Sequence, residues 1–185
     1  MNRNRNYCLH ESAHSLIAWA LGYRLEFCFV IPDGGRSYNH PPLPKSLSDY
    51  VNLFTLFAAG DQGEISGAEM GVFNDAPPVP PLTNPQAIDD AITSVAAIVS
   101  AELEPNEIMS DFGAIVVLVD DAIKAGQITE TNAHHWYRIG RQRAEEVLQQ
   151  HAEKFIQLYR ALLQWGCLDS QHLMEILGPS PAGAS

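Results

Sequence analysis

The sequence predicts a mainly helical α+β fold, with a single domain over residues 1–178 and a small β-sheet beside the first helix. Apolar residues recur at helical spacing through most of the chain. Residues 24–31 are instead rich in aromatic and β-branched side chains, and Pro32 ends that run. A length of 185 residues suits one domain with a sizeable core.

The N-terminal region is expected to supply the helix and the strand that lie together. The first helix is predicted over residues 4–21, and Gly22 follows at a position that favours glycine. The strand 24–31 comes next, and the turn Asp33-Gly34-Gly35 leads toward a second short strand. Residues 32–47 are then expected to be a loop, because their four prolines exclude regular structure.

The middle of the chain is predicted to alternate between helices and proline-rich loops. Ser48 is a suitable N-cap for a helix that runs to about Ser66. Residues 71–84 contain four prolines and are expected to form a loop. Asn84 and Pro85 then start another helix, which runs through Val99.

The C-terminal part is predicted to be helical throughout. A helix from Pro105 to about Ala125 is apolar on all sides around residues 115–119, which favours a central position in the fold. Thr129 or Thr131 caps the next helix. Two further helices are predicted, one at Phe155–Trp165 and one at Ser170–Leu177. Residues 179–185 are predicted to form a disordered tail.

The composition excludes several classes of function. The formal net charge is −11, and no lysine or arginine lies between Lys45 and Lys124, so nucleic acid and anionic lipid are unlikely partners. No apolar run reaches the length of a membrane span. The three cysteines lack metal-binding or redox spacing, which favours a reducing, cytoplasmic location.

The segment with the clearest chemistry is His10-Glu11-Ser12-Ala13-His14, an HExxH pattern on the first predicted helix. Residues four apart lie on one helix face, so His10 and His14 can bind one Zn²⁺ together. Glu11 lies beside the metal without being a ligand, where a general base for a zinc-activated water is needed. The alternative is an ordinary helix whose histidines are exposed or hydrogen-bonded.

A catalytic zinc usually takes a third protein ligand. Asp89 and Asp90 lie near the start of a predicted helix whose other residues are apolar or small, and they are the preferred candidates. Acids at this position also complement the helix dipole, which is the alternative explanation. The two side chains point about 100° apart, so only one of them can reach the ion.

Three motifs resemble those of the FtsH-type zinc metallopeptidase domain. His10–Trp19 is similar to its HEAGHALVA motif, Phe57–Glu64 to its LAGRAAEE helix, and Ala87–Ile92 to its ASNDLERA segment. The pattern from Arg143 to Leu177 resembles the C-terminal part of that family, so the resemblance covers residues 4–178.

The resemblance implies a zinc-dependent endopeptidase with Glu11 as general base. Its zinc ligands would be His10, His14 and Asp90, with Asp89 as the alternative third ligand. A peptide or an unfolded protein would be the substrate, extended along an edge strand at Phe27, Cys28 and Phe29.

No ATPase module or membrane anchor of that family occurs within these residues, and Asp61 stands where its second motif has arginine. An ATPase supplied in trans is therefore an expected partner, and the expected assembly is a monomer or small homo-oligomer rather than an obligate hexamer. Two alternatives stay open: a zinc-binding regulatory or interaction module without turnover, and a metal-free helical adaptor.

Overall fold

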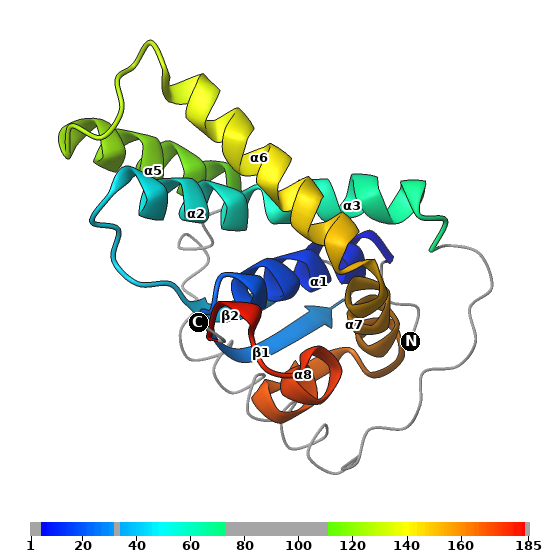
Figure 1. Ribbon diagram of the computed structural model, residues 1–185. Helices are drawn as coiled ribbons and strands as arrows, with labels where there is room; N and C mark the ends of the chain where they lie inside the picture. The colour runs from blue at the N-terminus through cyan, green and yellow to red at the C-terminus, as the bar shows by residue number, and fades with distance from the viewer. Residues whose placement is uncertain (1–4, 32–33, 73–110, 184–185) are drawn as a thin grey trace.

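Helix α1, Arg5–Ala20, lies at the centre of the fold. The structure is a computed structural model that describes residues 5–31, 34–72 and 111–183. A three-stranded sheet covers one side of α1, and helices α3 and α6 cross the other side (Figure 1). The fold is thus mainly α with a small antiparallel sheet next to the HExxH helix, as predicted.

The main hydrophobic core forms around α1 because that helix is buried on most of its surface. Eleven of its 16 residues are buried, including the polar side chains of Glu11, Ser12, His14 and Ser15. The core also takes residues from the sheet and from helices α7 and α8, among them Cys28, Phe155, Leu162 and Leu173.

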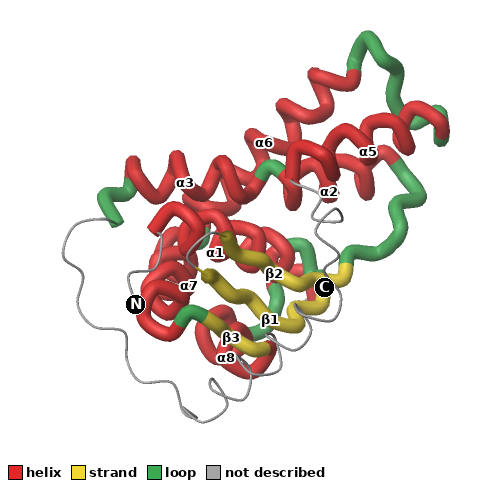
Figure 2. The backbone as a smooth tube through the Cα atoms, turned by 180° about the vertical axis from the view of Figure 1, so that it is seen from behind, coloured by secondary structure: helices red, strands yellow, loops and turns green. Residues whose placement is uncertain are grey.

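Strand β1, Arg24–Ile31, is the middle strand of the sheet, in the order β2-β1-β3 (Figure 2). Its partners are β2, Gly34–His40, and β3, Cys167–Asp169, both antiparallel. The turn at residues 33–35 was expected to lead toward a second short strand, but residues 32–47 as a whole were predicted to be loop, and β2 shows that prediction to be wrong for residues 34–40. Strand β3 was not predicted, because it is too short to show a period-2 pattern. The expectation that Phe27, Cys28 and Phe29 lie on an edge strand is wrong, because all three pair with β2 and with β3.

The helix predicted from Ser48 to Ser66 is two helices, α2 at Leu47–Phe57 and α3 at Ala59–Glu69, which separate at Ala58. They pack on different partners: α2 on α5 and α6, and α3 chiefly on α1. The N-cap of α2 is Ser46 rather than Ser48, with a capping box formed by Ser46 and Asp49.

Helix α3 approaches α1 closely because three glycines face it. A Cβ atom at Gly60 would overlap the His10 ring, and one at Gly63 would overlap the Ala13 side chain. At Gly67 it would lie 2.6 Å from Leu9 Cδ2. These positions recur at spacings of three and four residues, so they form one stripe along the helix.

Helices α5, Asp111–Lys124, and α6, Ala133–Gln150, pack with α2 around a second, smaller core (Figure 1). The prediction that the apolar helix around residues 115–119 is central is wrong, because only Leu118 and Ala122 of α5 are buried. Helix α6 follows Asn132 rather than a threonine cap, and Asn132 Oδ1 accepts a hydrogen bond from the Thr129 backbone N–H.

Helices α7, Ala152–Trp165, and α8, Ser170–Leu177, end the helical part near their predicted bounds. Disorder was expected from residue 179 onward, but the chain continues into a 3₁₀ turn, Pro181–Gly183, against the end of α1. Trp19 Nε1 donates to the Gly178 carbonyl, and Ser180 Oγ donates to the Trp19 carbonyl. Among the described residues, no helix combines the length and apolar character needed to cross a bilayer.

Candidate metal centre

Helix α1 places His10, Glu11 and His14 together near its middle, as the HExxH spacing predicts. The two imidazole rings face the same direction, with centroids 4.9 Å apart. His14 is 7% exposed, whereas His10 lies closer to the surface. The rings are therefore positioned one turn apart at the edge of the core, where a polar ligand can reach both.

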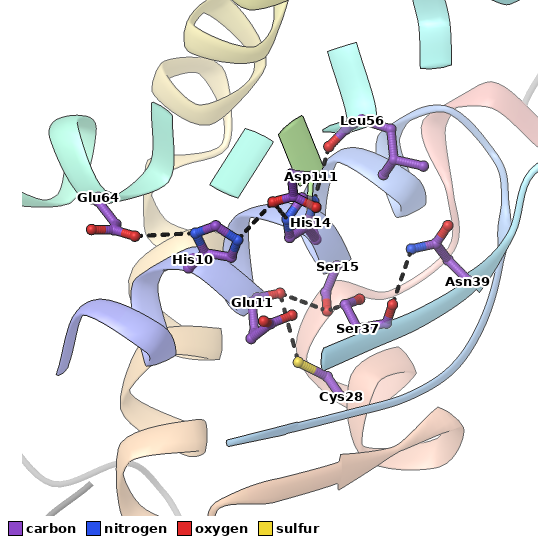
Figure 3. A network of polar contacts seen from close by, with 10 residues as sticks. All are labelled: His10, Glu11, His14, Ser15, Cys28, Ser37, Asn39, Leu56, Glu64 and Asp111. Atoms are coloured by element: carbon purple, nitrogen blue, oxygen red, sulfur yellow. Dashed lines mark hydrogen bonds and ion pairs between the residues drawn. The ribbon is translucent and has the colours of Figure 1, made fainter. Parts of the chain in front are cut away.

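Asp111, the first residue of α5, completes the cluster (Figure 3). Its Oδ2 atom lies 2.8 Å from His10 Nε2 and 2.9 Å from His14 Nε2. Two nitrogens and one carboxylate oxygen thus converge on one small volume, and these three side chains form a group that could hold a metal ion. Imidazole nitrogens and carboxylate oxygens are among the ligand types that zinc takes in proteins.

The Nδ1 atoms, which face away from Asp111, fix the orientation of both imidazoles. His14 Nδ1 lies 2.9 Å from the Leu56 carbonyl oxygen, which can only accept, so Nδ1 carries the hydrogen. His10 Nδ1 lies 3.1 Å from Glu64 Oε1 on α3. A ligating histidine usually makes such a bond to a carbonyl or carboxylate through its other nitrogen.

This pattern tests whether the residues fit a cation. A neutral imidazole that donates through Nδ1 has only a lone pair at Nε2, and here both Nε2 atoms face the acceptor oxygen of Asp111. Lone pairs that face one another repel unless a positive charge lies between them, either a proton or a metal ion. The donor set therefore fits a bound cation in this position, or a proton in its place.

Without an ion, a proton on His10 supplies positive charge. Burial disfavours a charged His10, but its hydrogen bond to Asp111 and the charges of Glu11 and Asp111 outweigh burial and raise the pKa of His10 to about 9. Burial likewise disfavours the Asp111 carboxylate, yet the hydrogen bonds from His10 and His14 hold its pKa well below the usual range. The cluster is thus a strong ion pair at neutral pH in its metal-free form.

Glu11 lies beneath the two histidines and is 5% exposed. Burial raises the pKa of Glu11 above its usual value, against the opposing charges of His14 and His10. Its side chain rests on β2 at Gly35, where a Cβ atom would lie 2.7 Å from Glu11 Cγ. The carboxylate therefore occupies space that exists only because residue 35 has no side chain.

A short polar network ties this part of α1 to the sheet (Figure 3). Ser15 Oγ donates to the Glu11 carbonyl over 3.0 Å and lies 2.9 Å from Ser37 Oγ of β2. Cys28 Sγ donates to the same carbonyl over 3.6 Å. The position of β2 relative to Glu11 is thus fixed at two points, Gly35 and Ser37.

Two other features lie nearby without forming part of the proposed centre. His10, Asp61 and Glu64 make a second group of ligand-type side chains, but it shares His10, and Glu64 contacts the ring nitrogen that faces away from Asp111. A groove of about 590 Å³ lies between α3 and α6, lined by residues that include Gln62, Ile65, Arg138 and Arg141. None of the histidines of the centre lines it.

The predicted catalytic and metal-binding residues divide into two groups. His10, Glu11 and His14 come together, whereas Asp89 and Asp90 lie outside the described residues. Asp111 was not singled out, because in the sequence it is one more acid in a long acidic stretch. The contacts of Glu64 and of the Leu56 carbonyl were also missed, since neither has a spacing signal relative to the HExxH motif.

Comparison with known proteins gives no family assignment. No protein-family model matches the chain, and no curated protein matches it either. The chemistry of the centre must therefore be argued from its own residues.

Proposed function

We propose that this chain is a zinc-dependent peptidase that hydrolyses peptide bonds in extended or unfolded substrates. The observation that carries the proposal is the convergence of His10 Nε2, His14 Nε2 and Asp111 Oδ2, with the buried Glu11 directly beside them. The resemblance of the HExxH segment and the C-terminal pattern to the FtsH-type peptidase domain supports it.

In this proposal His10, His14 and Asp111 hold the ion. A bound Zn²⁺ supplies Lewis-acid chemistry, which polarises a carbonyl and makes water more acidic. Glu64 and the Leu56 carbonyl keep the two imidazoles in the tautomer that presents Nε2 to the ion. In this proposal three side chains bind the ion, and Glu64 and the Leu56 carbonyl orient the two histidines.

Glu11 moves the proton. Its carboxylate takes a proton from the attacking water and returns it to the leaving amine. Burial raises the pKa of the Glu11 carboxyl group. A carboxylate with a raised pKa is a stronger base, and a general base works best when its pKa is close to the operating pH. The Gly35 contact keeps the carboxylate close to the histidines while it does so.

An extended substrate would lie along β2. This strand is at the edge of the sheet as the structure describes it, and Gly35 and Ser37 of β2 lie next to Glu11 and Ser15. A peptide added to that edge gains backbone hydrogen bonds that do not depend on its sequence. Folded proteins cannot offer such a strand, so they would need an unfolding partner, such as an ATPase in trans.

Substitution of Glu11 tests the proposal. Glu11→Gln should keep near-stoichiometric zinc and lower peptide hydrolysis by at least ~10²-fold, because it removes the general base and leaves the ligands in place. Zinc is measured by elemental analysis of protein purified without a histidine tag, and hydrolysis with unfolded casein. Zinc binding by the wild type without any hydrolysis would instead support a regulatory zinc-binding module.

The third ligand is tested separately, because the structure and the sequence resemblance favour different aspartates. Asp111→Ala should weaken zinc binding strongly, and Asp90→Ala and Asp89→Ala should not. Zinc titration against a competing chelator compares the three variants. If Asp90→Ala removes the metal while Asp111→Ala retains it, the assignment from the resemblance is correct and Asp111 only pairs with the histidines.

A further inference from the structure

Strand β2 presents two different faces, because successive side chains of a strand point to opposite sides of the sheet. Gly35 and Ser37 face α1. The Glu11 side chain fills the space where a Cβ atom of Gly35 would lie, and Ser37 Oγ is 2.9 Å from a serine hydroxyl of that helix. Arg36 and Tyr38 therefore lie on the other face of the same strand.

The Arg36 side chain is held on that second face by aromatic contacts. Its guanidinium carbon lies 4.9 Å from the centroid of the Tyr38 ring, which is a cation–π contact. The Tyr38 ring lies 4.3 Å from the Phe27 ring of β1. Arg36 is exposed and forms no ion pair with another described residue. Its guanidinium is therefore positioned and still able to bind a carboxylate from outside.

Arg36 also lies close enough to Glu11 for its charge to be felt there. Burial is the main influence on the pKa of Glu11 and raises it, while the charges of His14, His10 and Arg36 act in the opposite direction. The contact between Gly35 and Glu11 gives the geometric reason, since Arg36 is the next residue of β2. A substrate whose scissile bond lies at the proposed centre would therefore pass near this guanidinium.

A peptide that adds to the free edge of β2 continues the alternation of the sheet. The substrate residue opposite Gly35 lies on the face of Glu11, at the proposed centre. The next substrate residue lies opposite Arg36 and points to the other face. Directly opposed side chains of paired strands have Cβ atoms only about 4.5–5.5 Å apart. A carboxylate at that substrate position can therefore pair with the guanidinium.

We infer that Arg36 selects substrates that carry an aspartate or glutamate in the strand position opposite it, beside the residue at the proposed centre. This inference rests on the proposed function, and it specifies the class of substrate. Tyr38 is a positioning residue, because its ring keeps the guanidinium on this face of the sheet. The preference is local and separate from the net charge of −11, which acts on all parts of an acidic peptide alike.

Binding to an inactive protein tests the inference without relying on turnover. Zinc-loaded Glu11→Gln protein is titrated with two labelled, end-blocked peptides of threonine and valine. They differ only in the central residue, which is glutamate in one and lysine in the other. The quantity compared between variants is the ratio of the two dissociation constants.

Charge reversal at Arg36 should change this ratio. Arg36→Glu should shift it by ~10-fold or more in favour of the lysine peptide, because the attraction and the repulsion across the strands both change sign. Arg24→Glu is the matched control, since it makes the same change in net charge near the other end of the β1–β2 pair, where Arg24 pairs with His40. At physiological salt it should shift the ratio by less than ~2-fold, because exposed charges are screened over ~8 Å.

Two further measurements distinguish strand pairing from other causes. Arg36→Lys keeps the positive charge and should retain the preference to within ~3-fold. Peptides whose backbone nitrogens are all methylated have no N–H donors for β2 and should not bind detectably. Zinc content and thermal unfolding are measured for every variant, so that a loss of binding is not confused with a loss of the fold.

The outcomes separate this inference from the proposed function. A ratio that Arg36→Glu leaves unchanged, or that Arg24→Glu shifts equally, overturns the inference even if the wild type cleaves casein. Binding that survives methylation, or no binding of either peptide, overturns it as well, because the substrate then does not add to β2. A shift specific to Arg36 without any hydrolysis by the wild type supports selection at β2 and defeats the peptidase proposal.

Discussion

Helices α1 and α5 both contribute to the candidate metal centre, but they are held in the fold very differently. Eleven of the 16 residues of α1 are buried, and it packs against the sheet, α3, α6 and α7. Only Leu118 and Ala122 of the 14 residues of α5 are buried, and its main contact is α2. The histidines are therefore part of a fixed core, whereas Asp111 sits on a helix that makes few contacts with the other described residues.

This difference implies that the two sides of the centre have different energetic roles. The position of His10 and His14 follows from folding itself, because α1 cannot leave the core without unfolding the protein. The position of Asp111 is stabilised in part by the bonds that it makes to those histidines. Binding of a cation should consequently strengthen the attachment of α5 more than that of α1.

The largest expected effect comes from cavities in the two cores. Leu16→Ala in α1 should lower the free energy of unfolding by about 3–5 kcal/mol, because Leu16 is fully buried in close packing. Leu118→Ala in α5 should cost about 2 kcal/mol, since its smaller core can relax toward the solvent. Urea denaturation measures both. A larger loss for Leu118→Ala would show that α5 is the better anchored helix.

Zinc should have the next largest effect, and it should act on α5. At about a hundredfold excess over its dissociation constant, zinc should raise the free energy of unfolding by ~2.7 kcal/mol. Removal by a chelator should speed hydrogen exchange in α5 while α1 stays protected. Asp111→Ala should abolish both the stabilisation by zinc and the effect of the chelator on hydrogen exchange. Asp120→Ala, at the far end of the same helix, should leave both unchanged. Equal changes in both helices would contradict the comparison.

The metal-free and zinc-loaded forms should respond to pH in opposite directions. His10 has a pKa raised from 6.5 to about 9, so its bond to Asp111 stabilises the metal-free protein fully below pH 6.5 and is lost as the pH rises through 9. If zinc binds as proposed, it would replace the proton on His10, and the zinc-loaded form should gain stability over the same range.

Thermal unfolding at pH 6 and pH 9, with and without chelator, measures these slopes. His10→Gln should flatten the slope of the metal-free form. A metal-free protein that is more stable at pH 9 than at pH 6 would show that this ion pair does not stabilise the fold.

The smallest expected effect concerns α2, the helix that supports α5. Ser46→Ala should lower the free energy of unfolding by ~1 kcal/mol, because it removes the N-cap and half of the capping box. Ser48→Ala, inside the same helix, should change it by less than ~0.5 kcal/mol. Chemical denaturation compares the two serines, and equal losses would contradict the assigned cap.

The sequence predicted best what depends on local periodicity. Helix α1, strand β1 and the last two helices follow from apolar spacing and glycine stops, and the HExxH spacing places His10 and His14 together because both lie on one helix. The N-cap of α2 was misplaced by two residues, since both Ser46 and Ser48 precede the apolar stretch and only the capping box with Asp49 distinguishes them.

Features that depend on tertiary contacts could not be predicted in this way. Asp111 reaches the histidines across about a hundred residues of chain, and no spacing rule links positions so far apart. The uniform apolar character of residues 115–119 suggested a central helix, but of these five residues only Leu118 is buried. The pairing of β1 on both sides depends on β3, which is only three residues long.

The glycine stripe of α3 has a consequence for the order in which the chain folds. Each glycine in a helix interior costs ~1 kcal/mol relative to alanine, so Gly63 and Gly67 together cost ~2 kcal/mol of helix propensity, and Gly60 in the first turn adds a smaller cost. An 11-residue helix with that handicap does not persist alone. Helix α3 should therefore form only as it docks on an existing α1. We expect low φ-values for the residues of α3, and we expect the Glu64–His10 contact to form late in folding.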